Sequence, residues 1–284
     1  MILTALSVII RIISNPVANM FEKRISMEGS SLYTSLYSYL FMSIFCIPFL
    51  FLYNWKSVPF EFWIYCTLAG ALCAIGRACM VRALRLGELS VLGPVNSYKA
   101  IVGLIIAFFM LGEIPDISGI LGMLLILFGS FFIFETLEEK FSFKILFRED
   151  IILRFIALIM TGIEAVILKK IIIMSSVMMS FLMWCFMGFI FTFLIVLMTK
   201  RNFTPIKRTH IKGYFMICLG LILMQISTNY VFKNMNVGYA LSLFQLSSIV
   251  NILFGFKFFK EKNILKKIIG SAVMIIGSVI IINS

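Results

Sequence analysis

Ten stretches of about twenty apolar residues, joined by short polar connections, constrain this chain more than any other feature. A helix needs about 20 largely apolar residues to cross the hydrocarbon core of a bilayer. A chain of 284 residues that is 61% hydrophobic cannot bury that much apolar surface in water. The sequence therefore predicts an all-α integral membrane protein with ten transmembrane helices. They are expected at residues 2–21, 32–53, 61–82, 89–111, 116–135, 151–170, 176–199, 213–232, 238–258 and 264–283.

The basic residues predict how the chain is oriented. Eighteen lysines and arginines, Arg154 among them, lie in the connections after the first, third, fifth, seventh and ninth segments. Only four, Lys56, Lys169, Lys170 and Lys233, lie on the opposite side. The positive-inside rule then places the basic loops in the cytoplasm and both termini outside the inner or plasma membrane. The first apolar run lacks the basic start and cleavage site of a secretory signal, so we expect it to be a retained helix.

The second half of the sequence repeats the first. A shift of 148 residues places Glu113 on Glu261, Gly122 on Gly270 and Gly129 on Gly277. We therefore expect two five-helix repeats, residues 1–140 and 141–284, within one membrane domain. Because five is odd, the second repeat enters the membrane from the opposite side. Inverted repeats of this kind recur in secondary transporters, which hold their substrate near the midplane between the halves.

Several residues and short motifs of the repeat are similar to those of a known family. Residues Ala83 to Glu88 read ALRLGE, and they are followed by Pro94, by Leu111-Gly112-Glu113, and by Gly119, Gly122 and Gly129. This pattern resembles the EamA-type unit of the drug/metabolite transporter superfamily, and a weaker copy ends in Lys260-Glu261, Gly270 and Gly277. The resemblance implies ten helices, a central cavity lined by helices 1, 3, 4, 6, 8 and 9, and cytoplasmic termini. The cytoplasmic termini disagree with the count of basic residues, which places both termini outside, and we follow the count.

Four charged residues lie inside the expected helices. Arg11, Arg77, Lys99 and Glu164 all fall on helices that the resemblance places around the cavity. A charge at the bilayer centre costs about 2.5–3.5 kcal/mol on insertion scales, so such residues usually face a cavity or a partner. Three cations against one carboxylate suggest that the substrate supplies an anionic group, which the arginine fork suits. Glu164 would bind an amine or carry a coupling proton, although it could instead neutralise one of the cations.

Polar residues on the same helices complete the predicted site. Asn15 lies one turn from Arg11, and Gln225 and Asn229 lie four residues apart on the eighth segment. Each amide could equally serve as a hydrogen bond between helices. The substrate-binding candidates are Arg11, Asn15, Arg77, Tyr98, Lys99, Glu164, Gln225, Asn229 and Gln245.

The sequence contains few motifs that would indicate an enzyme or a cofactor-binding protein. It contains no GxxxxGK[ST], GxSxG or HExxH run, its six cysteines form no CxxC pair, and His210 is its only histidine. We expect no enzyme activity, no cofactor or metal, no nucleic-acid partner, membrane lipid as surroundings, and a monomer sufficient for function. The favoured hypothesis is a secondary-active or exchange transporter of a small organic anion or zwitterion. The alternatives are a lipid-linked flippase, a cationic amine or drug carrier that uses Glu164, and a membrane scaffold without transport.

Overall fold

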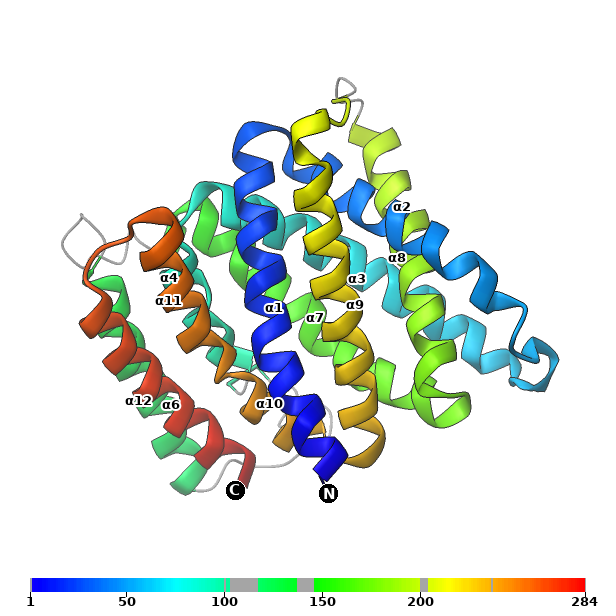
Figure 1. Cartoon of the computed structure of the whole chain (residues 1–284). Helices are drawn as coiled ribbons and strands as arrows, with labels where there is room; N and C mark the ends of the chain where they lie inside the picture. The colour runs from blue at the N-terminus through cyan, green and yellow to red at the C-terminus, as the bar shows by residue number, and fades with distance from the viewer. Residues whose placement is uncertain are drawn as a thin grey trace.

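The computed structural model describes residues 2–99, 101–102, 117–136, 146–199, 204–235 and 237–283, and every element in these ranges is a helix. The helices form one bundle, in which the start of α1 and the end of α12 lie at the same end (Figure 1). The α-helices are α1 (Ile2–Glu28), α2 (Ser31–Leu50), α3 (Phe60–Leu86), α4 (Leu89–Leu92), α6 (Ile117–Phe134), α7 (Glu149–Met174), α8 (Val177–Thr199), α9 (Ile211–Asn234), α10 (Val237–Phe244), α11 (Ser247–Phe259) and α12 (Ile264–Asn283). The 3-10 turns are η1 (Trp55–Ser57), η2 (Pro94–Ser97) and η4 (Arg208–His210).

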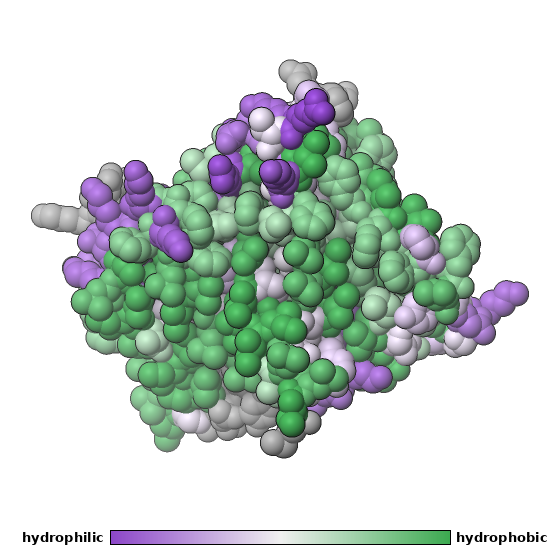
Figure 2. All heavy atoms as spheres, in the orientation of Figure 1, coloured by the Kyte–Doolittle hydropathy of each residue, from purple (hydrophilic) through white to green (hydrophobic). Residues whose placement is uncertain are grey.

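Seven helices in the described part of the chain are long and apolar enough to cross a membrane: α1, α2, α3, α6, α7, α8 and α9, the last counted from Arg208. Their length and composition make the chain a multi-pass membrane protein. Figure 2 shows the surface that follows from this, with hydrophobic atoms covering the middle of the bundle. Hydrophilic atoms gather at the top of that view, where α9 begins, and at the upper left, where α11 meets α12 (Figures 1 and 2). We call this end of the bundle the basic end.

Two of the expected helices are interrupted. The segment predicted at 238–258 is two helices, α10 and α11, with a turn at Gln245 and Leu246, so the prediction of one continuous helix there is wrong. In the segment predicted at 89–111, α4 ends at Leu92 and η2 follows. Pro94 ends α4 because it has no backbone N–H and its ring clashes with the preceding turn. Residues 103–111 lie outside the described residues.

The two interruptions face each other across the bundle. The side-chain amide of Asn96 donates to Oε1 of Gln245 (3.2 Å), and Nε2 of Gln245 donates to the backbone oxygen of Asn96 (3.3 Å). The break at Gln245 has no proline or glycine of its own. It coincides instead with this pair of hydrogen bonds, which joins it to the proline-dependent break of the first half. Discontinuous helices that meet in this way are a common basis for binding sites in transporters.

The helices pack as the internal repeat requires. The shift of 148 residues relates α1 to α7 and α3 to α9. In the structure α1 packs along α9, and α3 packs along α7, which is the pair obtained by exchanging the two halves. The related helices α6 and α12 pack along each other, as do α2 and α8. A two-fold relation between the halves accounts for all four pairs.

Glycines bring α6 and α12 into backbone contact. A Cβ atom placed on Gly129 would lie 2.7 Å from the oxygen of Gly270, and one on Gly277 would lie 2.6 Å from the oxygen of Gly122. Small residues allow this close approach between membrane helices. As residue numbers rise along α6, the contacts fall along α12, so the two helices run in opposite directions. The two glycine contacts exchange with each other under the 148-residue shift.

Candidate functional site

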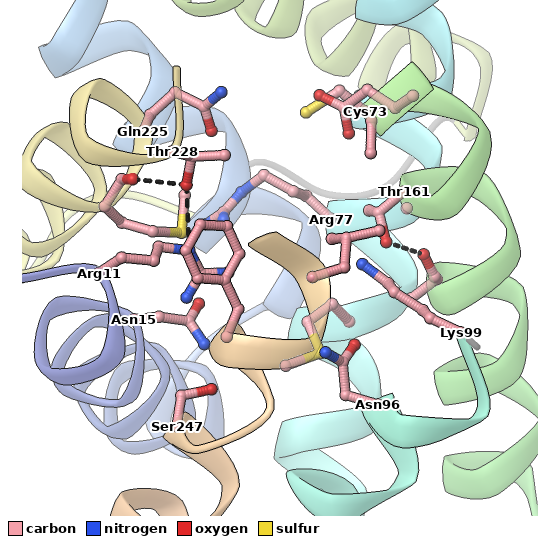
Figure 3. Close-up of a pocket in the computed structure, with 18 of the residues that line it drawn as sticks. Arg11, Asn15, Cys73, Arg77, Asn96, Lys99, Thr161, Gln225, Thr228 and Ser247 are labelled. Carbon is pink, nitrogen blue, oxygen red and sulfur yellow. Dashed lines mark hydrogen bonds between the residues drawn. The ribbon is translucent and has the colours of Figure 1, made fainter. Parts of the chain in front are cut away.

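A cavity of about 140 Å³ lies between the two halves of the bundle. Its walls come from α1, α3, α7, α8, α9, α10 and α11, together with residues around η2. Figure 3 shows Arg11 and Gln225 entering from one side of this space and Lys99 and Thr161 from the other. Both repeats therefore contribute polar side chains to the same cavity, close to the interruption at η2.

Arg11 and Lys99 present cationic groups to the cavity and form no ion pair with an acidic residue in the described part of the chain. Nε of Arg11 donates to Oγ1 of Thr228 (3.0 Å), and its guanidinium lies 4.8 Å from the ring centre of Phe244. One terminal nitrogen of Arg11 is buried and has no hydrogen-bond partner within the described ranges. Lys99 makes no hydrogen bond or ion pair to any residue that the structure describes. Unpaired cations in a membrane interior are costly, so this arrangement favours an anionic ligand.

Arg154 is a third cation of this wall. The sequence analysis counted it with the basic loop before α7, which is wrong: Arg154 lies inside α7, is buried, and lines the cavity. Its Nε donates to the carbonyl of Leu92 (2.8 Å), and a terminal nitrogen donates to Oδ1 of Asn96 (3.2 Å). Because these acceptors are neutral, Arg154 holds the interruption around η2 in place while its charge stays uncompensated.

Arg77 differs from the other cations because it has a carboxylate partner. A terminal nitrogen of Arg77 forms an ion pair with Glu22 of α1, whose side chain is fully buried. Arg77 lines the cavity as expected of a site residue, but its charge is already paired, and its role in binding an anionic group stays a prediction. The pair joins α1 to α3 on the wall of the cavity and stabilises that contact, since removing either partner would leave a buried charge.

Glu164 forms the acidic part of the cavity. It is buried on α7, and Nε1 of Trp184 donates to its Oε1 (3.1 Å). The ring of Trp184 packs against Tyr39, with centroids 5.2 Å apart. A carboxylate beside an aromatic face suits a positively charged amine. Glu164 forms no ion pair with Arg11 or Lys99 among the described residues, so it is not simply the neutralising partner of one of them.

Six of the nine predicted site residues line the cavity: Arg11, Asn15, Arg77, Lys99, Glu164 and Gln225. The other three do not. The hydroxyl of Tyr98 donates to Oγ of Ser130 on α6 (2.7 Å) and so points away from the cavity. Asn229 accepts a hydrogen bond from Nε2 of Gln225 (2.9 Å) and so fixes the position of that side chain. Gln245 is hydrogen-bonded to Asn96.

The sequence analysis missed several residues of the cavity and its wall. Asn96, Arg154, Thr161 and Thr228 line the space, and Glu22 pairs with one of its cations. Only Arg154 and Glu22 carried a usable signal, which is their charge. Arg154 already lay inside the helix expected at 151–170, and Glu22 would have been recognised as intramembrane had the first helix been extended beyond residue 21. Counting Glu22 with the lining residues, the site has four cations and two carboxylates among the described residues.

A second polar cluster joins the two halves of the bundle at the basic end. We call Lys23, Glu88, Ser90, Glu261 and Lys267 the basic-end cluster. Glu261 accepts the backbone N–H groups of Leu89 (2.8 Å) and Ser90 (2.9 Å), and Nζ of Lys23 binds Glu261 (3.0 Å) and the carbonyl of Gly87 (2.7 Å). Lys267, which is 1% exposed, binds Oγ of Ser90 (2.8 Å) and pairs with Glu88.

The charges of the basic-end cluster balance, in contrast to those of the cavity. Burial alone raises the pKa of the Glu261 carboxyl, but Lys23 and the hydroxyl and amide of Ser90 outweigh it and lower that pKa from its ordinary value of 4.5. Glu261 is therefore ionised at neutral pH and ties the α11–α12 connection to α1 and α4. This cluster joins residues of the two halves at the basic end.

Comparison with known proteins identifies the family. The model of the EamA-like transporter family matches the chain twice, at residues 2–135 and 150–283. The chain belongs to the EamA-like transporter family. The two matches are offset by 148 residues at both ends, which is the shift found between the two halves of the sequence. Membership of the EamA-like family makes the chain a multi-pass membrane protein that transports small molecules, and its relatives in the family are transporters rather than enzymes.

A solved structure shares the EamA-like chain's fold. It is a crystal structure of a protein with 13% sequence identity, and it covers 95% of this chain and 95% of its own, with a TM-score of 0.61. At this identity the likeness concerns the fold alone. A comparison with curated proteins finds no match.

Proposed function

We propose that the chain is a secondary-active or exchange transporter that moves a small organic anion or zwitterion across the cytoplasmic membrane by alternating access. The observation that carries this proposal is the cavity between the halves, where Arg11, Lys99 and Arg154 have no carboxylate partner among the described residues. A negatively charged substrate would provide the anionic partner that these three cations do not have in the described residues. The sequence has no ATP-binding motif, so a solute or proton gradient, or exchange, drives the cycle.

The size of the cavity limits the substrate. A protein cavity of about 150 Å³ holds a molecule the size of benzene, so about 140 Å³ accommodates roughly six non-hydrogen atoms. A small amino acid or a short carboxylic acid fits these limits, whereas a sugar nucleotide does not fit this conformation. In a zwitterion the carboxylate faces Arg11 and Lys99, and the amine faces Glu164 and Trp184. Glu164 is also the candidate for carrying a coupling proton.

The packing of the helices supports alternating access. We infer ten spans in two inverted five-helix repeats, because α6 and α12 are equivalent by sequence and run in opposite directions. The exchanged pairs α1–α9 and α3–α7 rock against each other around the cavity, while the basic-end cluster closes one entrance. We orient the basic end toward the cytoplasm on the charge bias of the loops, and one copy contains a whole cavity, so a monomer suffices.

The alternatives lack such support. A carrier of simple cations needs an excess of carboxylates, but the described cavity has an excess of cations. A flippase for lipid-linked phosphates needs cations beside a lateral opening, whereas Arg11, Lys99 and Arg154 lie inside the bundle. A scaffold without transport predicts that Arg11, Lys99 and Glu164 pair with one another and leave no cavity, and in the described residues they do not pair.

The test is a binding and uptake experiment with purified protein. Thermal unfolding is followed with small amino acids, short carboxylates, organic phosphates and simple amines, because a ligand that binds the folded state raises the unfolding temperature. Positive compounds are then tested for uptake into proteoliposomes. Hydrogen bonds to charged groups contribute about 1.5–3 kcal/mol, so Lys99→Ala and Arg11→Ala should weaken binding of the anionic or zwitterionic hit roughly tenfold or more.

Two controls make the result decisive. Lys257→Ala removes a lysine that is exposed at the surface and should leave binding unchanged. Glu164→Gln should reduce binding of a zwitterion but not of a carboxylate that has no amine. A hit among simple amines that survives Lys99→Ala and Arg11→Ala but is lost in Glu164→Gln would reject the anionic proposal.

A further inference from the structure

The outer face of the bundle carries an apolar groove between α2 and α9 that is separate from the central cavity. Its volume is about 360 Å³, and its walls are entirely apolar or aromatic side chains apart from one cysteine. Several of them are widely exposed, including Phe45 at 57%, Ile211 at 56% and Phe215 at 62%. By the same benzene comparison, the groove has room for roughly fourteen carbon atoms.

The length of the groove indicates what kind of molecule fits it. Along α9 it extends from Ile211 to Ile222, which is twelve residues, or about 17 Å at a rise of 1.5 Å per residue. The hydrocarbon core of a bilayer is about 30 Å thick, so the groove is as long as one leaflet. A partner helix that crossed the membrane would follow α9 through both leaflets. A groove that covers only one leaflet instead fits a single acyl chain whose headgroup stays at the membrane surface.

Basic residues lie at the surface end of the groove. Ile206 and Ile211 line it there, and the exposed residues Lys207, Arg208 and Lys212 are their neighbours in sequence. Lys212 also lines a pocket between α1 and α9. Figure 2 shows hydrophilic atoms gathered at this end, where α9 begins in Figure 1. The nearby carboxylate, Glu28, already binds Nε2 of His210 (2.8 Å), and of these three cations only Lys207 reaches that residue, at its backbone oxygen (3.5 Å). The groove therefore joins an apolar channel to three cations that no carboxylate pairs among the described residues.

We propose that this groove is a binding site for an anionic phospholipid. One acyl chain fills the groove between α2 and α9, and the lipid phosphate faces Lys207, Arg208 and Lys212. Anionic lipids near a membrane surface are attracted by about 1 kcal/mol for each lysine or arginine. The combination of a groove one leaflet long and cations at one end distinguishes this site from general solvation by lipid, which needs neither.

The experiment measures lipid binding to delipidated protein by native mass spectrometry. Phosphatidylglycerol and phosphatidylcholine with identical chains are added separately, followed by lysophosphatidylglycerol and by glycerol phosphate. We expect phosphatidylglycerol to bind at least tenfold more tightly than phosphatidylcholine. We expect lysophosphatidylglycerol to bind like the two-chain lipid, because one chain fills the groove, and glycerol phosphate to bind much more weakly.

Two variants test the two parts of the site, each with a matched control. Lys207→Gln/Arg208→Gln/Lys212→Gln should abolish the preference for phosphatidylglycerol, while the equal charge change Lys257→Gln/Lys260→Gln/Lys262→Gln in another loop of the basic end should retain it. Leu219→Trp fills the groove and should weaken binding of both phospholipids at least tenfold. Leu253→Trp, at an exposed position on α11, should not.

The outcomes that overturn the proposal are equally defined. Equal binding of the two phospholipids would show that the cations select no headgroup. Equal losses in the two triple variants would show diffuse attraction rather than a site. Tight binding of glycerol phosphate would show an anion site that does not use the groove. Because Leu219→Trp leaves the charges in place, it tests the groove even if the triple variant does not fold.

Discussion

At the scale of single residues, the charges inside the membrane divide into paired and unpaired groups. Arg77 has its carboxylate in Glu22, whereas Arg11, Lys99 and Arg154 have neutral partners or none in the described part of the chain. The paired group holds helices together, and the unpaired group is available to a ligand. This division explains why the same residue type, arginine, has different expected roles on α1, α3 and α7.

The pair between Glu22 and Arg77 gives the first prediction. Glu22→Gln leaves the buried guanidinium of Arg77 without its counter-charge and should lower the stability of the protein by about 3–5 kcal/mol. Glu22→Gln combined with Arg77→Met removes both charges and should recover most of that loss. Thermal unfolding of the detergent-purified variants measures both. A double variant no more stable than Glu22→Gln would contradict the assigned role.

Glu261 gives a prediction about pH. Its pKa is lowered in the folded protein, so its stabilising effect is complete above the ordinary value of 4.5 and is lost as the pH falls through the folded-state pKa. The unfolding temperature of the wild type should exceed that of Glu261→Gln at neutral pH, and the difference should shrink below about pH 4.5.

If the difference between the two unfolding curves were constant from neutral pH down to strongly acidic pH, Glu261 would not be the ionised partner of Lys23. Lys266→Gln is a suitable control, because Lys266 is exposed and pairs with the exposed Glu135 (3.4 Å). It should lower stability by less than about 1 kcal/mol at any pH in this range.

Much of the candidate site could be predicted from single residues, but not all of it. Arg11, Lys99 and Glu164 stood out because a charge in the middle of an apolar run is costly. Glu22 and Arg154 did not, because each lies near a helix end beside other charges and reads as part of a loop. Tyr98 was wrongly included since its direction is decided by Ser130 on α6, which no local pattern reveals.

At the scale of elements, the contact between α6 and α12 depends on glycine. A methyl group at Gly129 would lie 2.7 Å from the oxygen of Gly270 and 2.9 Å from the nitrogen of Met274. Gly129→Ala should therefore force the helices apart and destabilise the protein by about 1–3 kcal/mol in thermal unfolding.

The chain offers a matched control for that substitution. Gly162 lies on α7, and a Cβ placed there meets nothing within 4 Å. Gly162→Ala should leave stability unchanged or raise it by up to about 1 kcal/mol, because alanine favours helix more than glycine does. Similar losses in both variants would mean that helix propensity, and not the close approach to α12, explains the glycine at position 129.

The apolar runs predicted most of the elements, because a helix that crosses the hydrocarbon core of a bilayer must be apolar along its length. They failed at the interruption of the segment 238–258. Gln245 and Leu246 carry no helix-breaking residue, and the break coincides with hydrogen bonds to Asn96, which lies 149 residues earlier in the chain. A contact between residues so far apart in the chain cannot be recognised from a short stretch of sequence. The interruption near Pro94 was easier to foresee, since proline ends a helix by itself.

At the scale of the whole molecule, the proposed orientation can be tested by labelling. Ten spans place both termini on one side, together with Lys56, and place Lys207 and Lys262 on the other side. In a variant without its six free cysteines, a single cysteine at position 56 should react with an impermeant maleimide added to intact cells. Cysteines at positions 207 or 262 should react only after the membrane is opened. The reverse pattern would reject the orientation and favour cytoplasmic termini.

Two lysines of the basic-end cluster have no basic counterpart in the other half of the sequence. Under the 148-residue shift, Ile171 stands where Lys23 does in the first half, and Gly119 corresponds to Lys267. In the proposed alternating-access cycle, the two closed states would therefore differ in energy, and the empty carrier would rest with its basic end shut. The gradient would still set the direction of net flux. The half-saturation concentration would differ between the two faces of the membrane, so the carrier would load at lower substrate concentration on the side to which it is open at rest.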